Sequence, residues 1–325
     1  MIRMIGRAVF VLAAMALGTS VSARAEDYPT KPITIIVPFG AGGITDTLAR
    51  QMADKLKPIL GQSVIVVDRP GQGGSLGPRY VVNAKPDGYT VGLIGSANTI
   101  GQTLYTNLPY DLLKDLEPVR GLVSIVNVLI VHPSVKANSV KDIIAMAKEK
   151  PGQIKFSSSG AGGIYHLDLE LFKSISGVDI LHVPYRRESG GRTAVIGGQV
   201  TGMFDAYGVV ASSIKAGQLR ALAVTSTERF SGLPNIPTMA EAGVPGYDGD
   251  AFLGLVAPKN TPKAILGRLN DAFSKVVNDP QFRTKLASQG MSVFNEQTPE
   301  EFGKFLKSQV DRWAKVIKYA HVTKH

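Results

Sequence analysis

The sequence predicts an exported α/β protein with two lobes and a mixed, mainly parallel sheet in each lobe. Short β-branched runs alternate with helical patterns along the chain, which is typical of parallel sheets covered by helices. A strand, a glycine-rich loop and a helix follow one another twice, in widely separated parts of the sequence. The mature chain would have roughly 300 residues, which is enough for two medium-sized domains with their own cores.

The N-terminus has the features of a secretory signal peptide. Arg3 and Arg7 precede an apolar stretch from Ala8 to Val21, and Ala23 and Ala25 then fit an A-x-A cleavage site. An uncleaved membrane anchor is the alternative, but the stretch is shorter than the roughly 20 apolar residues that a spanning helix needs. We therefore expect residues 1–25 to be removed after Ala25 and the mature protein to reach the periplasm.

The composition excludes several classes of site. The chain contains no cysteine, which rules out disulfides, thiolate metal sites and cysteine nucleophiles. The formal net charge is +10, and removal of the three arginines of the signal leaves +7. This excess either attracts anionic solutes or lies on a solvated surface. Because an exported protein rarely meets nucleic acid, we expect no nucleic-acid partner.

The first strand–loop–helix unit begins with a strand at Ile33–Val37. The loop Pro38–Gly43 leads from it into a helix in which apolar residues recur every four positions, at Leu48, Met52 and Leu56. Thr45 or Asp46 is expected to cap this helix. Glycines let a ligand approach the backbone, and the free N–H groups at a helix start favour an anion.

The second unit repeats this arrangement. A strand at Ile154–Ser157 is followed by the loop Ser158–Gly163 and a helix that carries Leu169, Phe172 and Ile175. In open α/β sheets, ligands bind beyond the carboxyl ends of the strands, where such loops lie. One loop from each lobe would form a clamp around an anionic ligand. Alternatively, the glycines only make tight turns between strand and helix.

The remaining elements continue the α/β pattern. Further strands are expected at Val64–Val67, Thr90–Ile94, Asp179–Val183, Thr201–Asp205 and Leu219–Thr225. A short helix is expected near Pro78–Ala84, and another follows a capping box formed by Thr238 and Glu241. Pro262, Pro280 and Pro299 each follow a threonine or aspartate, so each should be the first residue of a C-terminal helix.

Several longer motifs resemble one known family. They include the opening Tyr28–Ile33, the stretch Gly42–Asp46, the segment Pro86–Thr90, the string His182–Tyr185 and the segment Pro237–Gly243. In their order along nearly the whole mature chain, these motifs are similar to those of the Bug-type receptors of tripartite tricarboxylate transporters.

The resemblance implies a periplasmic binding protein of type II, a two-lobed Venus flytrap. The chain would cross between lobes near Val128 and Phe252, so that residues 26–127 and 253–325 form the first lobe and 128–252 the second. Such receptors have no catalytic group, cofactor or metal. They bind a carboxylated solute, such as a di- or tricarboxylate or an aromatic acid, and deliver it to the integral membrane subunits of the transporter. Shuttling of this kind favours a monomer.

The candidate ligand-binding residues come mainly from the two loops. They are Phe39, Gly42, Gly43, Thr45, Asp46, Ser96, Ser158, Ser159, Gly160, Gly162, Tyr185, Arg186 and Asp205.

Three positions depart from the pattern of the family. Ala41 replaces a usual proline, Gly163 replaces a common serine, and the Arg186–Arg187 pair replaces Lys-Gly. We hypothesise that Arg186 or Arg187 binds a second acid group of the ligand, since guanidinium groups match carboxylates; a solvated surface pair is the alternative. Asp205 could accept a hydrogen bond from an ammonium or hydroxyl group of the ligand, or pair with a nearby arginine.

Two enzyme-like motifs compete with the receptor interpretation. The segment Gly73–Gly77 fits the G-x-S-x-G motif, so a secreted serine hydrolase that uses Ser75 is the alternative function. However, Pro70–Gln72 separate this motif from the preceding strand, whereas a nucleophile elbow follows its strand directly. His166 and Glu170 share one helix face, but two ligands do not make a metal site. We expect His166 to cap or pack near the second loop.

Overall fold

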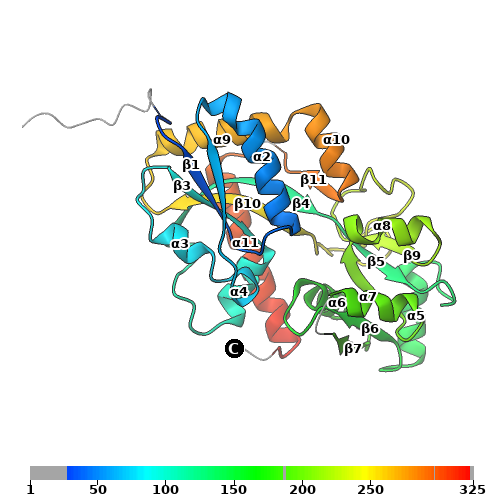
Figure 1. The fold of residues 1–325 in the computed structure, drawn as a ribbon. Helices are drawn as coiled ribbons and strands as arrows, with labels where there is room; N and C mark the ends of the chain where they lie inside the picture. The colour runs from blue at the N-terminus through cyan, green and yellow to red at the C-terminus, as the bar shows by residue number, and fades with distance from the viewer. Residues whose placement is uncertain (1–27, 186–187, 296, 323–325) are drawn as a thin grey trace, which may run out of the picture.

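The chain folds into two α/β lobes that lie side by side, each built on one β-sheet (Figure 1). The computed structural model describes residues 28–185, 188–295 and 297–322, so the expected signal peptide lies outside the described residues. A mixed sheet in each lobe confirms the fold class expected from the sequence. Within the described ranges, no helix is both long and apolar enough to cross a membrane.

The first lobe contains a six-stranded sheet with the order β11-β4-β10-β3-β1-β2. β1 is parallel to β2 and β3, and β10 runs antiparallel between β3 and β4. The strands are β1 Ile33–Val37, β2 Val64–Asp68, β3 Thr90–Gly95, β4 Leu116–Ile125, β10 Ala251–Pro258 and β11 Met291–Val293. The helices are α2 Ile44–Leu60, the 3-10 turn η2 Gln72–Gly74, α3 Pro78–Val82, α4 Ser96–Leu104, α9 Lys263–Val277, α10 Pro280–Ser288 and α11 Pro299–Tyr319.

The second lobe contains a five-stranded sheet with the order β7-β6-β8-β5-β9. β6 is parallel to β7 and β8, and β5 runs antiparallel between β8 and β9. The strands are β5 Asn127–Val131, β6 Lys155–Ser158, β7 Leu181–Pro184, β8 Gly202–Ala206 and β9 Arg220–Val224. The helices are α5 Val140–Glu149, α6 Ile164–Ser176, α7 Glu188–Ile196 and α8 Tyr207–Lys215.

The two sheets share one topology. In each sheet the first parallel strand, β1 or β6, lies between two strands that run parallel to it, and the antiparallel strand enters from the other lobe. β6 and α6 therefore occupy in the second lobe the places of β1 and α2 in the first. This equivalence brings the carboxyl ends of β1 and β6, and the loops that follow them, to corresponding positions at the junction of the lobes.

The chain passes twice between the lobes. β4 ends at Ile125 and β5 begins at Asn127, so only Val126 separates the two sheets at the first crossing. The second crossing lies between β9 and Ala251, where β10 begins. The sequence analysis placed these crossings near Val128 and Phe252. Both of those residues lie inside a strand, one or two positions after the change of sheet.

Helix α11 packs against both lobes. Phe302 and Leu306, in its first half, join a core cluster with residues of the first sheet. Trp313, Val316 and Ile317, in its second half, belong to the core cluster of the second lobe. In Figure 1 the helix runs along the junction of the lobes. The sequence analysis assigned residues 253–325 to the first lobe, but the second half of α11 contributes its apolar face to the second.

The start of α2 differs from the expectation. Gly43 is the N-cap residue and no side chain caps the helix, so the expected cap by Thr45 or Asp46 is wrong. Asp46 instead lies in the first turn, where its carboxylate accepts a hydrogen bond from the Gly42 amide at 2.7 Å. The uncapped start leaves backbone N–H groups of the first turn available to a ligand.

The C-terminal helix starts agree better with the sequence. Asp279 and Thr298 cap α10 and α11, as expected, and the following prolines begin those helices. Pro262, by contrast, is the N-cap of α9 and not its first residue. Thr238 and Glu241 form both hydrogen bonds of a capping box, at 3.0 and 3.1 Å, but the segment remains a turn and no helix follows.

Candidate ligand-binding site

The two glycine-rich loops have nearly the same backbone conformation. Gly42 has φ +79° and Gly162 has φ +77°, in the left-handed region that favours glycine. The next residues, Gly43 and Gly163, are N-caps with an extended backbone. Gly43 has φ −73° and ψ 171°, and Gly163 has φ −72° and ψ 163°. Neither α2 nor α6 has a side-chain cap. Each lobe therefore presents an uncapped helix start, with the positive end of the helix dipole, at an equivalent position.

A side chain in the first turn of each helix holds the loop. In the first lobe this residue is Asp46, whose carboxylate accepts from Gly42 and pairs with Arg50 Nε at 2.7 Å. Arg50 also reaches Asp68 at 3.2 Å. In the second lobe the equivalent residue is His166, whose Nδ1 accepts from the Gly162 amide at 3.0 Å. The expectation that His166 packs near the second loop is confirmed.

His166 is an uncharged acceptor. Burial lowers its pKa to about 3, and the neighbouring His182 and Lys173 contribute to this effect. The two imidazole rings are stacked with their centroids 3.8 Å apart. Burial, followed by Lys173, lowers the pKa of His182 to about 4. Both rings are therefore neutral at physiological pH, and the loop of the second lobe carries no charge from them.

A cavity of about 680 Å³ lies between the two loops. The first lobe contributes the start of α2, one face of α4 and the start of β10, and the second lobe contributes the loop before α6 and the start of α8. Within the described part of the chain, no lysine, arginine, histidine, aspartate or glutamate lines this cavity. Among the described residues, an anionic group that binds here would meet backbone amides, hydroxyl groups, the side-chain amides of Gln72 and Asn127, and the helix dipoles.

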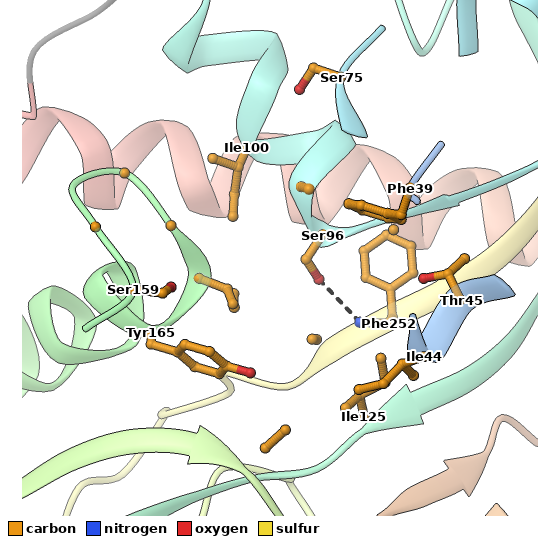
Figure 2. Close-up of a pocket in the computed structure, with 18 of the residues that line it drawn as sticks. Phe39, Ile44, Thr45, Ser75, Ser96, Ile100, Ile125, Ser159, Tyr165 and Phe252 are labelled. Carbon is orange, nitrogen blue, oxygen red and sulfur yellow. Dashed lines mark hydrogen bonds between the residues drawn. The ribbon is translucent and has the colours of Figure 1, made fainter. Parts of the chain in front are cut away.

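The walls of the cavity are mainly apolar. Figure 2 shows Phe39, Phe252 and Ile125 along one side and Ile100 on another, with Tyr165 approaching from the second lobe. Phe252 makes edge-to-face contacts with Phe302 and Phe305, at centroid distances of 6.4 and 4.9 Å. These contacts fix the aromatic wall before any ligand arrives.

Hydroxyl groups from both lobes supplement the amides. Ser96 accepts a hydrogen bond from the Phe252 amide at 3.1 Å, which ties α4 to β10 at the edge of the cavity (Figure 2). Thr45 is 6% exposed, and none of the described residues hydrogen-bonds its hydroxyl group. Ser159 lines the cavity from the other lobe.

The structure brings seven of the thirteen sequence-predicted residues to the cavity. They are Phe39, Gly43, Thr45, Ser96, Ser159, Gly160 and Gly162. Arg186 and its neighbour Arg187 lie outside the described residues. The other five, which do not line the cavity, are Gly42, Asp46, Ser158, Tyr185 and Asp205.

Two of these five have structural partners that occupy their side chains. Asp205 is fully buried, and its carboxylate pairs with Arg192 at 2.7 Å, so the second of its two expected roles applies. Ser158 is also fully buried, and its hydroxyl group lies 2.6 Å from His182 Nε2. The same hydroxyl accepts from the Gly160 amide at 3.1 Å, so Ser158 positions the loop and does not reach the cavity.

Sequence reasoning missed the apolar wall. Ile44, Ile100, Ile125, Tyr165 and Phe252 all line the cavity. Ile44 directly follows the first predicted loop and Tyr165 is the second residue after the other, so their positions could have been inferred. Ile125 and Phe252 lie at the two crossings between lobes, where an alternating strand pattern does not distinguish a residue of the core from one of a cleft.

The structure also places the residues of the enzyme-like motifs. Ser75 follows the 3-10 turn Gln72–Gly74, while β2 ends at Asp68, so the serine does not sit at a strand-to-helix elbow. It is 1% exposed and lies against Gly101 of α4. Among the described residues, no group of three histidine or carboxylate side chains is arranged to hold a metal ion.

The fold and the site together define a class of protein. Two lobes of the same α/β topology, a double crossing and a cavity between paired helix starts are the features of a solute-binding protein. A family model described as the tripartite tricarboxylate transporter family receptor matches residues 48–322. The chain belongs to this family, which confirms the resemblance to Bug-type receptors.

Known relatives agree with this assignment. BugT of Bordetella pertussis (strain Tohama I) is 34% identical over 303 residues, which cover 93% of each chain. The solved structure of R. palustris Rpa4515 with adipate has a TM-score of 0.77 and 32% identity, and the match covers 92% of this chain and all of the other. MatC (Rpa3494) from Rhodopseudomonas palustris with bound malate has a TM-score of 0.72 and 27% identity over 89% of this chain and all of the other. The family and its solved relatives are receptors and binding proteins, not enzymes.

Proposed function

We propose that this protein is a periplasmic receptor that binds a small carboxylate between its lobes and delivers it to the membrane subunits of a tripartite tricarboxylate transporter. The observation that carries the proposal is the pair of equivalent, uncapped helix starts at one cavity. Such helix starts stabilise an anion through backbone N–H groups and the helix dipole. Gly43 and Gly163 would donate directly or through ordered water.

The relatives support the carboxylate as the recognised group. Adipate is present in the structure of Rpa4515 and malate in that of MatC. The match to this protein covers the whole chain of each of these two structures. The membership of the receptor family supports the transporter as the partner. Removal of residues 1–25 and release of a monomer into the periplasm complete this proposal.

Calorimetric titration of the purified mature protein tests the proposal. A panel of one-, two- and three-acid ligands, aliphatic and aromatic, is compared with the corresponding primary amides. At least one acid should bind, while its amide, which has no negative charge for the helix starts to stabilise, should bind at least tenfold more weakly. Equal binding of acid and amide, or the absence of binding by every acid, would contradict carboxylate recognition.

Monomer state and export need separate measurements. Light scattering on the mature protein should give the mass of a single chain. Mass spectrometry of the protein recovered from the periplasm should show an N-terminus at Glu26. A retained signal segment would contradict cleavage after Ala25 without affecting the proposed ligand site.

A further inference from the structure

We propose that the cavity selects a monocarboxylate with an apolar body, and that the start of α6 holds the ligand carboxylate more strongly than the start of α2. This inference rests on the proposed function and specifies its ligand. Two observations carry it. The two loops have the same backbone conformation, but the side chain that holds the first loop is a carboxylate and the one that holds the second is a neutral imidazole. In addition, no charged side chain among the described residues lines the cavity.

The loop of the first lobe already holds a carboxylate. Asp46 occupies the first turn of α2 and accepts the Gly42 amide at 2.7 Å. Its partner Arg50 is shared with Asp68, so two carboxylates face one guanidinium group. The group has a net charge of about −1, and a carboxylate in the first turn already compensates the positive end of the helix dipole. A second anion is therefore less favoured at this helix start.

The loop of the second lobe has no such charge. His166 takes the place of Asp46 and accepts the Gly162 amide as a neutral imidazole. The carboxylate of Glu170 is 3.7 Å from His166 Nε2 and is paired with Lys173 at 2.8 Å. His182, which stacks on His166, is also neutral. The helix dipole of α6 is therefore uncompensated, and its first N–H groups favour the anionic end of the ligand.

One wall of the cavity suits an apolar group. An added methyl group on Gly74 would come within 2.5 Å of the Phe39 ring, so this ring is packed tightly against η2. Phe252 is held by Phe305 at a centroid distance of 4.9 Å. With Ile100 and Ile125 they form a wall that can cover an aromatic or aliphatic body (Figure 2). A second carboxylate among these side chains would lose its hydration without gaining a cation.

Matched pairs of ligands test the class. Benzoate is compared with terephthalate, and hexanoate with adipate, by titration calorimetry at pH 7.5, where all the acids are ionised. In the pairs that bind, the monoacid should bind at least tenfold more tightly than the diacid. Equal or tighter binding of the diacid would overturn the inference. In that case, the double variant Arg186→Ala/Arg187→Ala is tested, and a loss of affinity for the diacid alone would assign its second acid group to these arginines. If no acid of the whole panel binds, the proposed function itself fails.

Charge substitutions test the position of the carboxylate. His166→Asp places a carboxylate under the second loop, as Asp46 does under the first, and should weaken the best monoacid at least tenfold relative to His166→Asn, the neutral control that keeps an acceptor. Asp46→Asn should tighten binding by less than threefold. Thermal melting checks that each variant is folded. Unchanged affinity in His166→Asp would overturn the placement of the carboxylate at α6. A tenfold or greater gain in affinity in Asp46→Asn would also overturn it, and this result is decisive even if His166→Asp does not fold.

Discussion

Alanine substitutions at the two ends of α2 separate a loss of ligand binding from a loss of stability. Gly42 precedes the helix at the cavity side and has φ +79°, and Gly61 is the C-cap at the far end with φ +67°. A Cβ atom at either position would meet no other atom within 4 Å. The two substitutions therefore differ little in sterics and in backbone strain, and Gly61→Ala serves as a matched control for Gly42→Ala.

The magnitude follows from the backbone. An alanine held in the left-handed region costs about 1–2 kcal/mol, so both variants should lose a similar free energy of unfolding. At Gly42 part of this strain can be relieved by rotation of the loop, which moves the amide of Gly43 and the start of α2 away from the ligand. A tenfold loss of affinity corresponds to about 1.4 kcal/mol, which is within the energy available from this strain.

Calorimetry and urea unfolding on both variants give the two quantities. Gly42→Ala should bind the best acid of the panel at least tenfold more weakly than the wild type, and Gly61→Ala should bind it within twofold. Gly61→Ala should lower the free energy of unfolding by about 1–2 kcal/mol, and Gly42→Ala should lower it by no more than that. Equal affinities of the two variants would refute the placement of the first loop at the ligand.

Two further substitutions test the junction of the lobes. Burial raises the pKa of Asp250 to about 7, although hydrogen bonds from Ser124 and Thr225 lower it. The folded protein then keeps a proton that the unfolded chain loses, so the free energy of unfolding should fall by up to about 1.4 kcal/mol per pH unit as the pH rises from about 4 to 7, and level off above it. Asp250→Asn should flatten this part of the urea-unfolding profile, and an unchanged slope would contradict the assignment. An added Cβ at Gly208 would collide with the backbone carbonyl oxygen of Gln289 in the other lobe. Gly208→Ala should therefore lower the free energy of unfolding by about 1–3 kcal/mol, whereas the control Gly267→Ala in α9, which meets no other atom, should not. Equal melting temperatures of the two variants would show that the contact between the lobes is not tight.

The loops were predictable because their chemistry is local. A strand, a run of glycines and an amphipathic helix adjoin one another in sequence, and the positive φ of Gly42 and Gly162 explains why glycines stand there. The repetition of this unit at Ser158–Gly163 also predicted a second lobe. The position of Ser158 in the loop did not reveal that its hydroxyl group contacts His182 and not the ligand. This contact depends on the stacking of His166 on His182, which are sixteen positions apart in the sequence.

The walls of the cavity and the buried pairs were not predictable in the same way. Whether Asp205 meets the ligand or Arg192 depends on the packing of α7 against β8, which no local pattern reports. Phe252 looks like any apolar residue of a strand until β10 is placed at the edge of the cleft. The amphipathic pattern of α11 indicates one buried face, but it cannot tell that Trp313 packs into the second lobe while Phe302 packs into the first.

A crystal structure of the complex with the tightest-binding acid tests the central claim most directly. The acid should lie in the cavity between the lobes, with a carboxylate oxygen about 3 Å from the amide nitrogen of Gly163 or Ile164, or one ordered water away from it. Its body should contact Phe39 and Phe252. A carboxylate bound only at the start of α2 would contradict its placement at α6, and a ligand bound outside the two loops would contradict the whole account.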